Sequence, residues 1–408
     1  MSEGRQRRVL VLQAAALPRS QGGATRHVEL FGRLQGWRHL IVAGNRSNYT
    51  RQKYRHRTEE FVTVPVPGYA SNGIGRVLNW LTYAIGAFFV GLWQRRISVV
   101  FGSSPHLMAP IAGWALAKIK RVPFVLEVRD LWPRSMVELG YLREGSRIHK
   151  ALVRLEGFLY RAAERIVVVV PGWQEHFASF GIPPEKLVVV SNGADPDDFA
   201  PTSTREKARA QLGVDGFVLI YAGAHGPANG LDQILDAAKH LHDCTFLLVG
   251  DGLEKARLME RVRDEIITNV RFHDPVPKSE LGNVFVAADV GLHTLTQADL
   301  FRDGISPNKL WDYMAAGLAV ITNVGGDFEK LIVDLDCGAA GAPEPGEAPE
   351  RALVDAIREL RSRSPEELVA MGRRGREYVE QHVSRTAMAT RLEETLDDVV
   401  GQREQARR

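Results

Sequence analysis

Residues 301–322, FRDGISPNKLWDYMAAGLAVIT, hold the side chains best suited to chemistry in this chain of 408 residues. Ser306 is a favoured N-cap residue, and the proline after it suits the first position of a helix. The free amides at the start of such a helix attract anions, and Lys309 and Arg302 add positive charge beside them. This segment therefore predicts a diphosphate site that needs no metal. The alternative is an ordinary capped helix packed on a sheet.

The same predicted helix carries two further polar residues. Asn308 stands in the first turn, where the free amides lie, and Asp312 follows one turn later. A carboxylate can accept hydrogen bonds from vicinal hydroxyls, so Asp312 is suited to hold a ribose. Gly317 then ends the helix before an apolar strand.

The elements that must position these residues alternate along the chain. Short apolar runs, typical of buried strands, are separated by longer amphipathic runs typical of helices. This βα alternation predicts parallel sheets. It is interrupted by the turn-rich stretch SNGADPDDF, which indicates a hinge between two domains. The strands are expected at residues 9–13, 39–42, 61–64, 99–101, 165–170, 187–190, 217–222, 246–249, 270–273, 289–293 and 318–322, with a further strand and its loop in VPFVLEVRDLWPRS.

Polar residues that follow the predicted strands are further site candidates, because open α/β sheets bind ligands at the carboxyl ends of their strands. Gly22 and Gly23 precede the first helix and would let a phosphate approach the backbone closely. Glu127 alternates with the apolar residues of its strand and is expected either to pair with Arg129 or to act in catalysis. The other candidates of this kind are Ser104, His106, Asp130 and Trp132.

Composition indicates a globular protein of two or three domains. The two cysteines, Cys244 and Cys337, fit no metal-ligand spacing, so we expect free thiols in a reducing compartment. The N-terminus runs directly into a predicted strand, and we expect no signal peptide. The net charge of +3 hides an asymmetry: residues 1–195 hold 27 Lys and Arg against 13 Asp and Glu, whereas the remainder holds 25 against 36. A basic half favours an anionic partner such as a membrane surface, although a plainly solvated surface is the alternative.

The most apolar stretch runs from Val77 to Trp93, VLNWLTYAIGAFFVGLW. It is shorter than the roughly 20 residues needed to span a bilayer and is interrupted by polar residues. We predict a helix buried in the first domain. The alternative is a face that dips into a membrane interface, with Arg76, Arg95 and Arg96 at the headgroups.

The order of the motifs resembles the family-4 retaining glycosyltransferases of GT-B fold. The resemblance spans nearly the whole chain and rests on the glycine pair, SNGADPDDF, YAGAHGPANGLDQILDAA, LLVGDG and SPNKLWDYMAAGLAVI. ATRHVELFGRL, EVRDLWP and GISPNKLWDYMAAG are most similar to the branch of bacterial L-fucosamine transferases of O-antigen and capsule assembly. The resemblance implies two Rossmann-like parallel-sheet domains that face a central cleft. These would be an acceptor-side domain at 1–195, a nucleotide-sugar domain at 196–370, and a helix at 371–408 that returns to the first domain and ends in a frayed tail.

The resemblance also implies roles for single residues. Gly22 and Gly23 would face the donor diphosphate, and Asp312 matches the acid that holds the ribose. The loop Gly250, Asp251 and Gly252 would lie near the nucleotide base.

This chain departs from the family pattern in the residues that contact phosphate. The arginine and lysine that usually follow the YxG strand are replaced by Ala224 and Asn229, so Arg302 and Lys309 would carry the phosphates. The first acid of the family motif falls on Gly304, and Asp303 is its candidate substitute. His225 is a further candidate donor contact.

The implied reaction is retaining transfer of a sugar, of EC class 2.4, without a protein nucleophile. Positive groups would stabilise the leaving diphosphate, which accepts the acceptor's proton. We assign catalytic roles to Arg129, Asp130, Lys309 and Arg302, and acceptor-side roles to Ser104, His106 and Trp132. The DxD spacings at Asp195 and Asp334 are interpreted as turns, so we expect no metal and no cofactor.

The main hypothesis is an enzyme that uses a nucleotide-diphosphate sugar, UDP-linked, and a polyprenyl-diphosphate-linked saccharide acceptor. It would be cytoplasmic, peripheral to the inner face of the cell membrane, and would bind no nucleic acid. The alternatives are a soluble glycosyltransferase acting on a small molecule, a non-catalytic sugar-nucleotide binding module, and a sugar-nucleotide epimerase of similar architecture.

Overall fold

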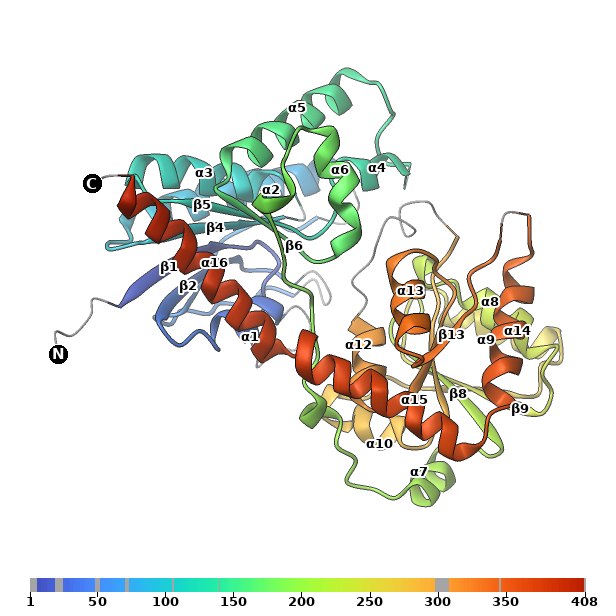
Figure 1. The fold of residues 1–408 in the computed structure, drawn as a ribbon. Helices are drawn as coiled ribbons and strands as arrows, with labels where there is room; N and C mark the ends of the chain where they lie inside the picture. Colours follow the sequence, from blue (N-terminus) through green and yellow to red (C-terminus); the bar gives the residue numbers. More distant parts are fainter. Residues whose placement is uncertain are drawn as a thin grey trace, which may run out of the picture. The chain divides into compact units, whose positions relative to one another are not determined.

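The computed structural model describes residues 6–18, 25–47, 52–69, 73–104, 106–138, 140–297, 308–344 and 346–406. The chain folds into two compact α/β units (Figure 1). The first unit comprises Met1–Ser191 with Thr386–Arg408, and the second comprises Asn192–Arg385. The last helix, α16 (Arg385–Gln405), therefore belongs to the first unit except for its first residue.

The sheet of the first unit has seven strands, all parallel, in the order β3-β2-β1-β4-β5-β6-β7. The β-branched and aliphatic side chains of Val9 to Leu12 are fully buried, as expected for a parallel strand covered on both faces. The strands are β1 (Arg7–Leu12), β2 (Trp37–Gly44), β3 (Phe61–Val64), β4 (Val99–Ser103), β5 (Phe124–Val128), β6 (Arg165–Val168) and β7 (Leu187–Val189).

The helices of the first unit connect these strands. They are α1 (Arg26–Phe31), α2 (Ile74–Trp93), α3 (Met108–Lys120), α4 (Arg134–Glu138), α5 (Arg147–Ala162) and α6 (Gln174–Ser179). Helix α16 adds buried apolar residues from the far end of the chain, among them Met388, Leu392 and Leu396. Its Asp397 accepts a hydrogen bond from the indole of Trp37 in β2 at 3.1 Å.

Helix α2 is not the buried helix that its apolar sequence predicts. It is the one helix in the described part of the chain that is long and apolar enough to cross a membrane, yet only 22% of its most apolar window is buried. Tyr83, Ala87 and Gly91 pack inward. Gly91 allows α2 to pack closely on α3, because a Cβ atom would lie 2.5 Å from a methyl group of Leu116, which would have to shift. The large apolar side chains that face outward are those of Ile74, Val77, Leu78, Leu81, Ile85, Phe89, Leu92 and Trp93.

The second unit has a six-stranded parallel sheet in the order β10-β9-β8-β11-β12-β13. Its strands are β8 (Phe217–Ala222), β9 (Cys244–Val249), β10 (Val270–His273), β11 (Val290–His293), β12 (Ala319–Thr322) and β13 (Gly338–Ala340). Its helices are α7 (Arg205–Leu212), α8 (Leu231–Ala238), α9 (Lys255–Asp264), α10 (Leu281–Phe285), α12 (Asn308–Ala315), α13 (Asp327–Asp334), α14 (Pro349–Arg361) and α15 (Pro365–Tyr378), which a π-helix (Val379–Val383) extends.

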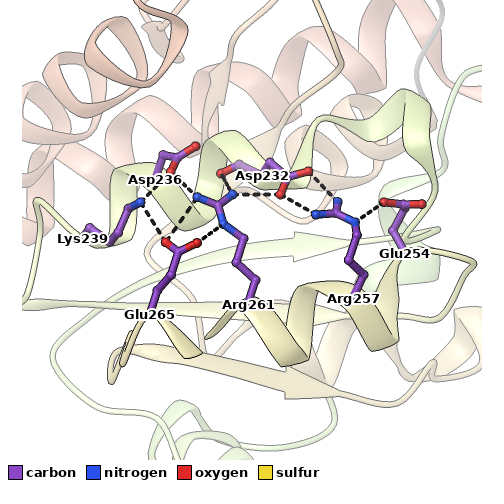
Figure 2. Close-up of polar contacts among 7 residues, drawn as sticks. All are labelled: Asp232, Asp236, Lys239, Glu254, Arg257, Arg261 and Glu265. Atoms are coloured by element: carbon purple, nitrogen blue, oxygen red, sulfur yellow. Dashed lines mark hydrogen bonds and ion pairs between the residues drawn. The ribbon is translucent and has the colours of Figure 1, made fainter. Parts of the chain in front are cut away.

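An ion-pair network ties α8 to α9 on the surface of the second unit (Figure 2). Arg261 of α9 reaches Asp232 at 2.8 Å and also pairs with Asp236, both of α8. Its Nε atom pairs with Glu265 at 2.7 Å, and these hydrogen bonds raise the pKa of Arg261 although burial acts against them. Arg257 adds a second pair to Asp232 at 2.6 Å. The network fixes the helix that follows β9.

The predicted fold class is therefore confirmed: both units are doubly wound parallel sheets. The predicted strands match observed ones to within a few residues, because short runs rich in β-branched residues, such as that of β6, favour a strand over a helix.

Candidate functional site

The candidate donor site lies at the carboxyl edge of the second sheet. From β8 the chain continues to β9 on one side, whereas β11 occupies the other side. Such a switch in strand order leaves a crevice between the two connections, and open α/β sheets bind their ligands there. The loops after β8, β9 and β11 and the helix α12 meet at this edge: Thr294, after β11, donates to the carbonyl of Asn229 at 2.8 Å.

Lys309, in the first turn of α12, reaches across this edge to the loop after β8. Its Nζ donates a hydrogen bond to Asn229 Oδ1 at 2.9 Å and lies 5.0 Å from the ring centre of Tyr221 in β8. Burial lowers the pKa of Lys309 to about 8, and Asp312 only partly opposes that effect. Asn229 is the residue that stands in place of the expected family lysine. The structure thus brings an amine from α12 to the position that the sequence left without a charge.

Glycines make this approach possible. A Cβ atom on Gly223 would lie 2.1 Å from Cε of Lys309, so only glycine lets the lysine cross the end of β8. Gly250 adopts a φ of +144°, and a Cβ atom there would lie 1.9 Å from the carbonyl oxygen of Gly223. A Cβ atom on Gly252 would lie 2.4 Å from the carbonyl oxygen of His225. The GDG loop is therefore packed directly on the loop after β8.

His225 sits at the junction of these two loops. Its backbone amide donates to the carbonyl of Asp251 at 2.9 Å, and its own carbonyl accepts from Glu254 N at 2.9 Å. The side chain is fully buried, and neither ring nitrogen has a hydrogen-bond partner among the described residues. Burial lowers its pKa to about 4, and Lys255 adds to the effect, so the ring is neutral at pH 7. A buried ring with an unused donor and an unused acceptor is a candidate ligand contact.

Asp312 lies one turn after Lys309 on α12 and has a different partner. Its carboxylate is 3.5 Å from Lys278 Nζ, and its side chain is only 14% exposed. Burial raises its pKa, which Lys278 and Arg385 partly offset. Asn308 is exposed at the first residue of α12. Five other candidates, Gly22, Gly23, Arg302, Asp303 and Ser306, lie outside the described residues.

The candidates of the first unit gather at the carboxyl ends of β4 and β5. Ser104 Oγ accepts a hydrogen bond from Arg129 N at 2.9 Å. Asp130 accepts one from Ser135 Oγ at 3.1 Å, and burial raises the pKa of Asp130. Trp132 and His106 have other contacts than Ser104 and Asp130. Instead both rings pack on Trp80 of α2, at centroid distances of 5.7 and 5.1 Å.

Glu127 does not pair with Arg129, contrary to one of the two predictions. Its carboxylate is 2.6 Å from His27 Nε2 and accepts from Arg26 Nη2 at 3.1 Å, both residues of α1. Burial opposes its ionisation, but His27 and Arg26 hold the pKa of Glu127 below its ordinary value. Arg26 also donates to the carbonyl of Val190 at 2.6 Å. Glu127 therefore anchors α1 to the centre of the sheet, and sequence reasoning missed both partners although they stand side by side at the start of α1.

Comparison with known proteins agrees with this architecture. Residues 22–193 match the family described as Glycosyl transferase 4-like domain, and residues 216–363 match Glycosyl transferases group 1. A probable glycosyltransferase of Pseudomonas aeruginosa, WbjE, is 26% identical over 64% of this chain and 66% of its own length. A putative colanic acid biosynthesis glycosyl transferase of Escherichia coli, WcaI, is 25% identical over 87% of this chain and 88% of its own length.

Solved structures show the same fold. Sucrose-phosphate synthase of Thermosynechococcus elongatus superposes with a TM-score of 0.74 at 17% identity, over 97% of this chain and 100% of that one. HepE of Anabaena, solved in complex with UDP, superposes with a TM-score of 0.69 at 18% identity, over 96% and 100%. WaaG, a glycosyltransferase involved in lipopolysaccharide biosynthesis, superposes with a TM-score of 0.64 at 17% identity, over 96% and 100%.

The fold and the two domain matches define the class, which is that of GT-B glycosyltransferases. This chain is a glycosyltransferase that joins a 4-like domain in its first half to a group 1 domain in its second half.

Proposed function

We propose that this glycosyltransferase moves a sugar from a UDP-linked donor to a lipid-linked saccharide during the synthesis of a bacterial surface polysaccharide such as O-antigen or capsule. The sequence resemblance favours an N-acetylated amino sugar of the fucosamine type. The named roles of WcaI in colanic acid and WaaG in lipopolysaccharide synthesis support the acceptor class, and the UDP complex of HepE supports the donor class.

The observation that carries the proposal is the position of Lys309. Its amine lies beside Asn229 at the carboxyl edge of the second sheet, the edge at which open α/β sheets generally bind ligands. The amine and the first turn of α12 together offer positive charge to a diphosphate. Lys309 thus replaces, from another element, the charge that Ala224 and Asn229 lack.

The reaction follows from where charge develops. The acceptor oxygen bonds to the anomeric carbon as the bond from that carbon to the diphosphate oxygen breaks, on the same face of the sugar. The leaving diphosphate takes the hydroxyl proton of the acceptor, and Lys309 and the α12 amides stabilise its growing charge. Configuration is retained, and no covalent enzyme intermediate forms.

The surface of the first unit supports a membrane-bound acceptor. The large side chains of α2 expose an apolar stripe, with Phe89 and Trp93 exposed to 55% and 81%. The first unit as a whole holds 31 Lys and Arg against 17 Asp and Glu, a net charge of +14. An apolar helix face on a basic unit is suited to lie in the interface of an anionic membrane. We place the enzyme at the inner face of the cell membrane, as a peripheral protein.

A thermal-shift panel tests the donor site. UDP, GDP, ADP and their sugar derivatives are added to the wild-type chain and to Lys309→Ala. A ligand that binds only the folded state raises the free energy of unfolding by mass action, by about 2.7 kcal/mol at a ligand concentration of 100 times its Kd. The melting temperature rises accordingly. We expect UDP compounds to stabilise the wild type and the shift to be lost in Lys309→Ala.

The matched control is Lys239→Ala, which removes a lysine from the surface of the same unit, away from the carboxyl edge. It should keep the full nucleotide shift. If no nucleotide stabilises the wild type, the donor assignment is wrong. If Lys239→Ala loses the shift as Lys309→Ala does, the role of Lys309 is wrong.

A further inference from the structure

The first unit holds a cavity of about 150 Å³, and none of the donor candidates that the structure describes lines it. It lies between the loops after β1 and β2 and the N-terminal half of α2. Arg76, Asn79, Trp80 and Tyr83 line it from one face of α2, since they are spaced at three and four residues. Arg46, from the loop after β2, and His106, from the loop after β4, line it as well.

The charged side chains that line this cavity are positive. Arg46 and Arg76 contribute two guanidinium groups, and no acidic residue is among the described residues that line the cavity. Arg76 stacks over the ring of Trp80 at 5.1 Å, which holds its head group in place. A planar guanidinium group can donate two parallel hydrogen bonds to two oxygens of one phosphate. Two guanidinium groups in one cavity therefore favour a phosphate ligand.

His106 is the second, independent sign of a ligand. It is 98% buried, since only 2% of its surface is exposed, and it lines the cavity. Both of its ring nitrogens lack a hydrogen-bond partner among the residues that the structure describes. A buried ring N–H without a partner is costly, and a ligand oxygen that accepts from it would remove that cost. Trp80 stacks on the ring at 5.1 Å and fixes its orientation.

Helix α2 joins this cavity to the apolar stripe. Arg76 and Trp80 line the cavity, whereas Val77 and Leu81, each the next residue along, are 46% and 42% exposed. A ligand with a phosphate in the cavity could therefore continue as a hydrocarbon chain along the outside of the same helix. No free sugar phosphate would use both features.

We propose that the cavity of Arg46, Arg76 and His106 binds the phosphate through which a polyprenyl lipid carries the acceptor saccharide, and that α2 contacts the lipid chain. This inference rests on the proposed function and adds the site and the chemical group by which the acceptor is recognised. The two arginines hold the charge, and neutral His106 donates to a phosphate oxygen.

Three probes separate the parts of this ligand. Farnesyl diphosphate has both the lipid chain and the phosphates, inorganic pyrophosphate has the phosphates alone, and farnesol has the chain alone. Binding to the full chain is measured by titration calorimetry below the critical micelle concentration of each lipid. We expect farnesyl diphosphate to bind at least tenfold more tightly than either of the other probes.

Two variants test the named residues. Arg76→Gln should weaken farnesyl diphosphate binding at least tenfold. His106→Phe should weaken it too, yet leave the melting temperature unchanged or higher, because it removes two unsatisfied buried nitrogens. If His106 only supported the fold, His106→Phe would lower the melting temperature and leave farnesyl diphosphate binding unchanged. The control Arg154→Gln removes an exposed arginine of α5 in the same unit and should bind like the wild type.

Each outcome decides the proposal. Pyrophosphate binding as tight as farnesyl diphosphate overturns the lipid part, and farnesol binding as tight overturns the phosphate part. Failure of all three probes, or binding that Arg76→Gln and His106→Phe leave unchanged, overturns the site. Lys309→Ala should keep farnesyl diphosphate binding, and His106→Phe should keep the nucleotide shift, so failure here is distinct from failure of the donor assignment.

Discussion

At the scale of single residues, we expect the ionisation of Lys309 to control donor binding. Its pKa is lowered to about 8, so its charge is lost as the pH rises through that value. We expect UDP affinity to fall between pH 7 and pH 9. Lys309→Arg keeps a charge throughout this range and should give a flatter profile. Titration calorimetry at three pH values measures the UDP affinity of the wild type and of Lys309→Arg. A wild-type affinity that stays constant to pH 9 contradicts the role of Lys309 in holding the diphosphate.

The same shift predicts the opposite trend for stability. The ordinary lysine pKa is 10.5, and the folded value is lower, so between the two values the unfolded chain binds more protons. The contribution of Lys309 to stability therefore rises with pH from about 8 to 10.5. Urea melts at pH 7.5 and 9.5 should show a larger gain for the wild type than for Lys309→Met, whose side chain does not titrate.

Gly223 offers a second test at this scale. Gly223→Ala places a Cβ atom 2.1 Å from Lys309 Cε, so the lysine must move. We expect nucleotide binding to fall at least tenfold, about 1.4 kcal/mol, while the buried strand β8 persists. Gly401→Ala is the matched control, because no atom lies within 4 Å of its added Cβ. Crystals of Gly223→Ala with Lys309 undisplaced would contradict the steric argument.

At the scale of elements, the α8–α9 network should stabilise the second unit. Arg261 has a side-chain exposure of 19% and three acidic partners, so it is better ordered than an isolated surface pair (Figure 2). Arg261→Ala should lower the free energy of unfolding by about 1 kcal/mol, and less at high salt. Arg263→Ala, on the same helix but 71% exposed, should change it far less. Urea melts at low and high salt measure the difference.

The exposed stripe of α2 gives a prediction about membranes. The double change of Phe89 and Trp93 to Ser removes two exposed apolar side chains and should greatly reduce flotation with anionic liposomes. The melting temperature should change little, since neither side chain is buried. Val369→Ser, at an exposed site on α15 of the second unit, is the control and should float like the wild type. Equal flotation of all three proteins would exclude α2 as the contact.

At the scale of the whole molecule, charge is divided between the two folded units. The first carries +14, whereas the second holds 21 Lys and Arg against 32 Asp and Glu, a net charge of −11. Charged surfaces separated by more than about 8 Å are screened at physiological ionic strength. We expect flotation with anionic liposomes to fall steeply as salt rises from 50 to about 500 mM, and flotation with neutral liposomes to be weak at every salt concentration. Binding that does not respond to salt would contradict an electrostatic contribution.

The sequence by itself determined the fold class and the family. Most strands of the two sheets contain a short run of β-branched or aliphatic residues, as in β1 and β6, and this local signal needs no tertiary information. Strand β13 (Gly338–Ala340) has no such run, and it was not predicted. The order of the glycine and proline motifs was equally readable, because special backbone conformations restrict which residues can occupy them.

Only the tertiary structure decided which side chains meet. Lys309 and Asn229 are 80 positions apart, and Glu127 lies 101 positions from Arg26, so no local pattern links them. The sequence also did not reveal that α2 is exposed. An apolar sequence shows that a helix can be buried, but it does not show whether other elements pack against it. Composition and periodicity are local quantities, whereas a binding site is set by the contacts that folding makes between distant segments.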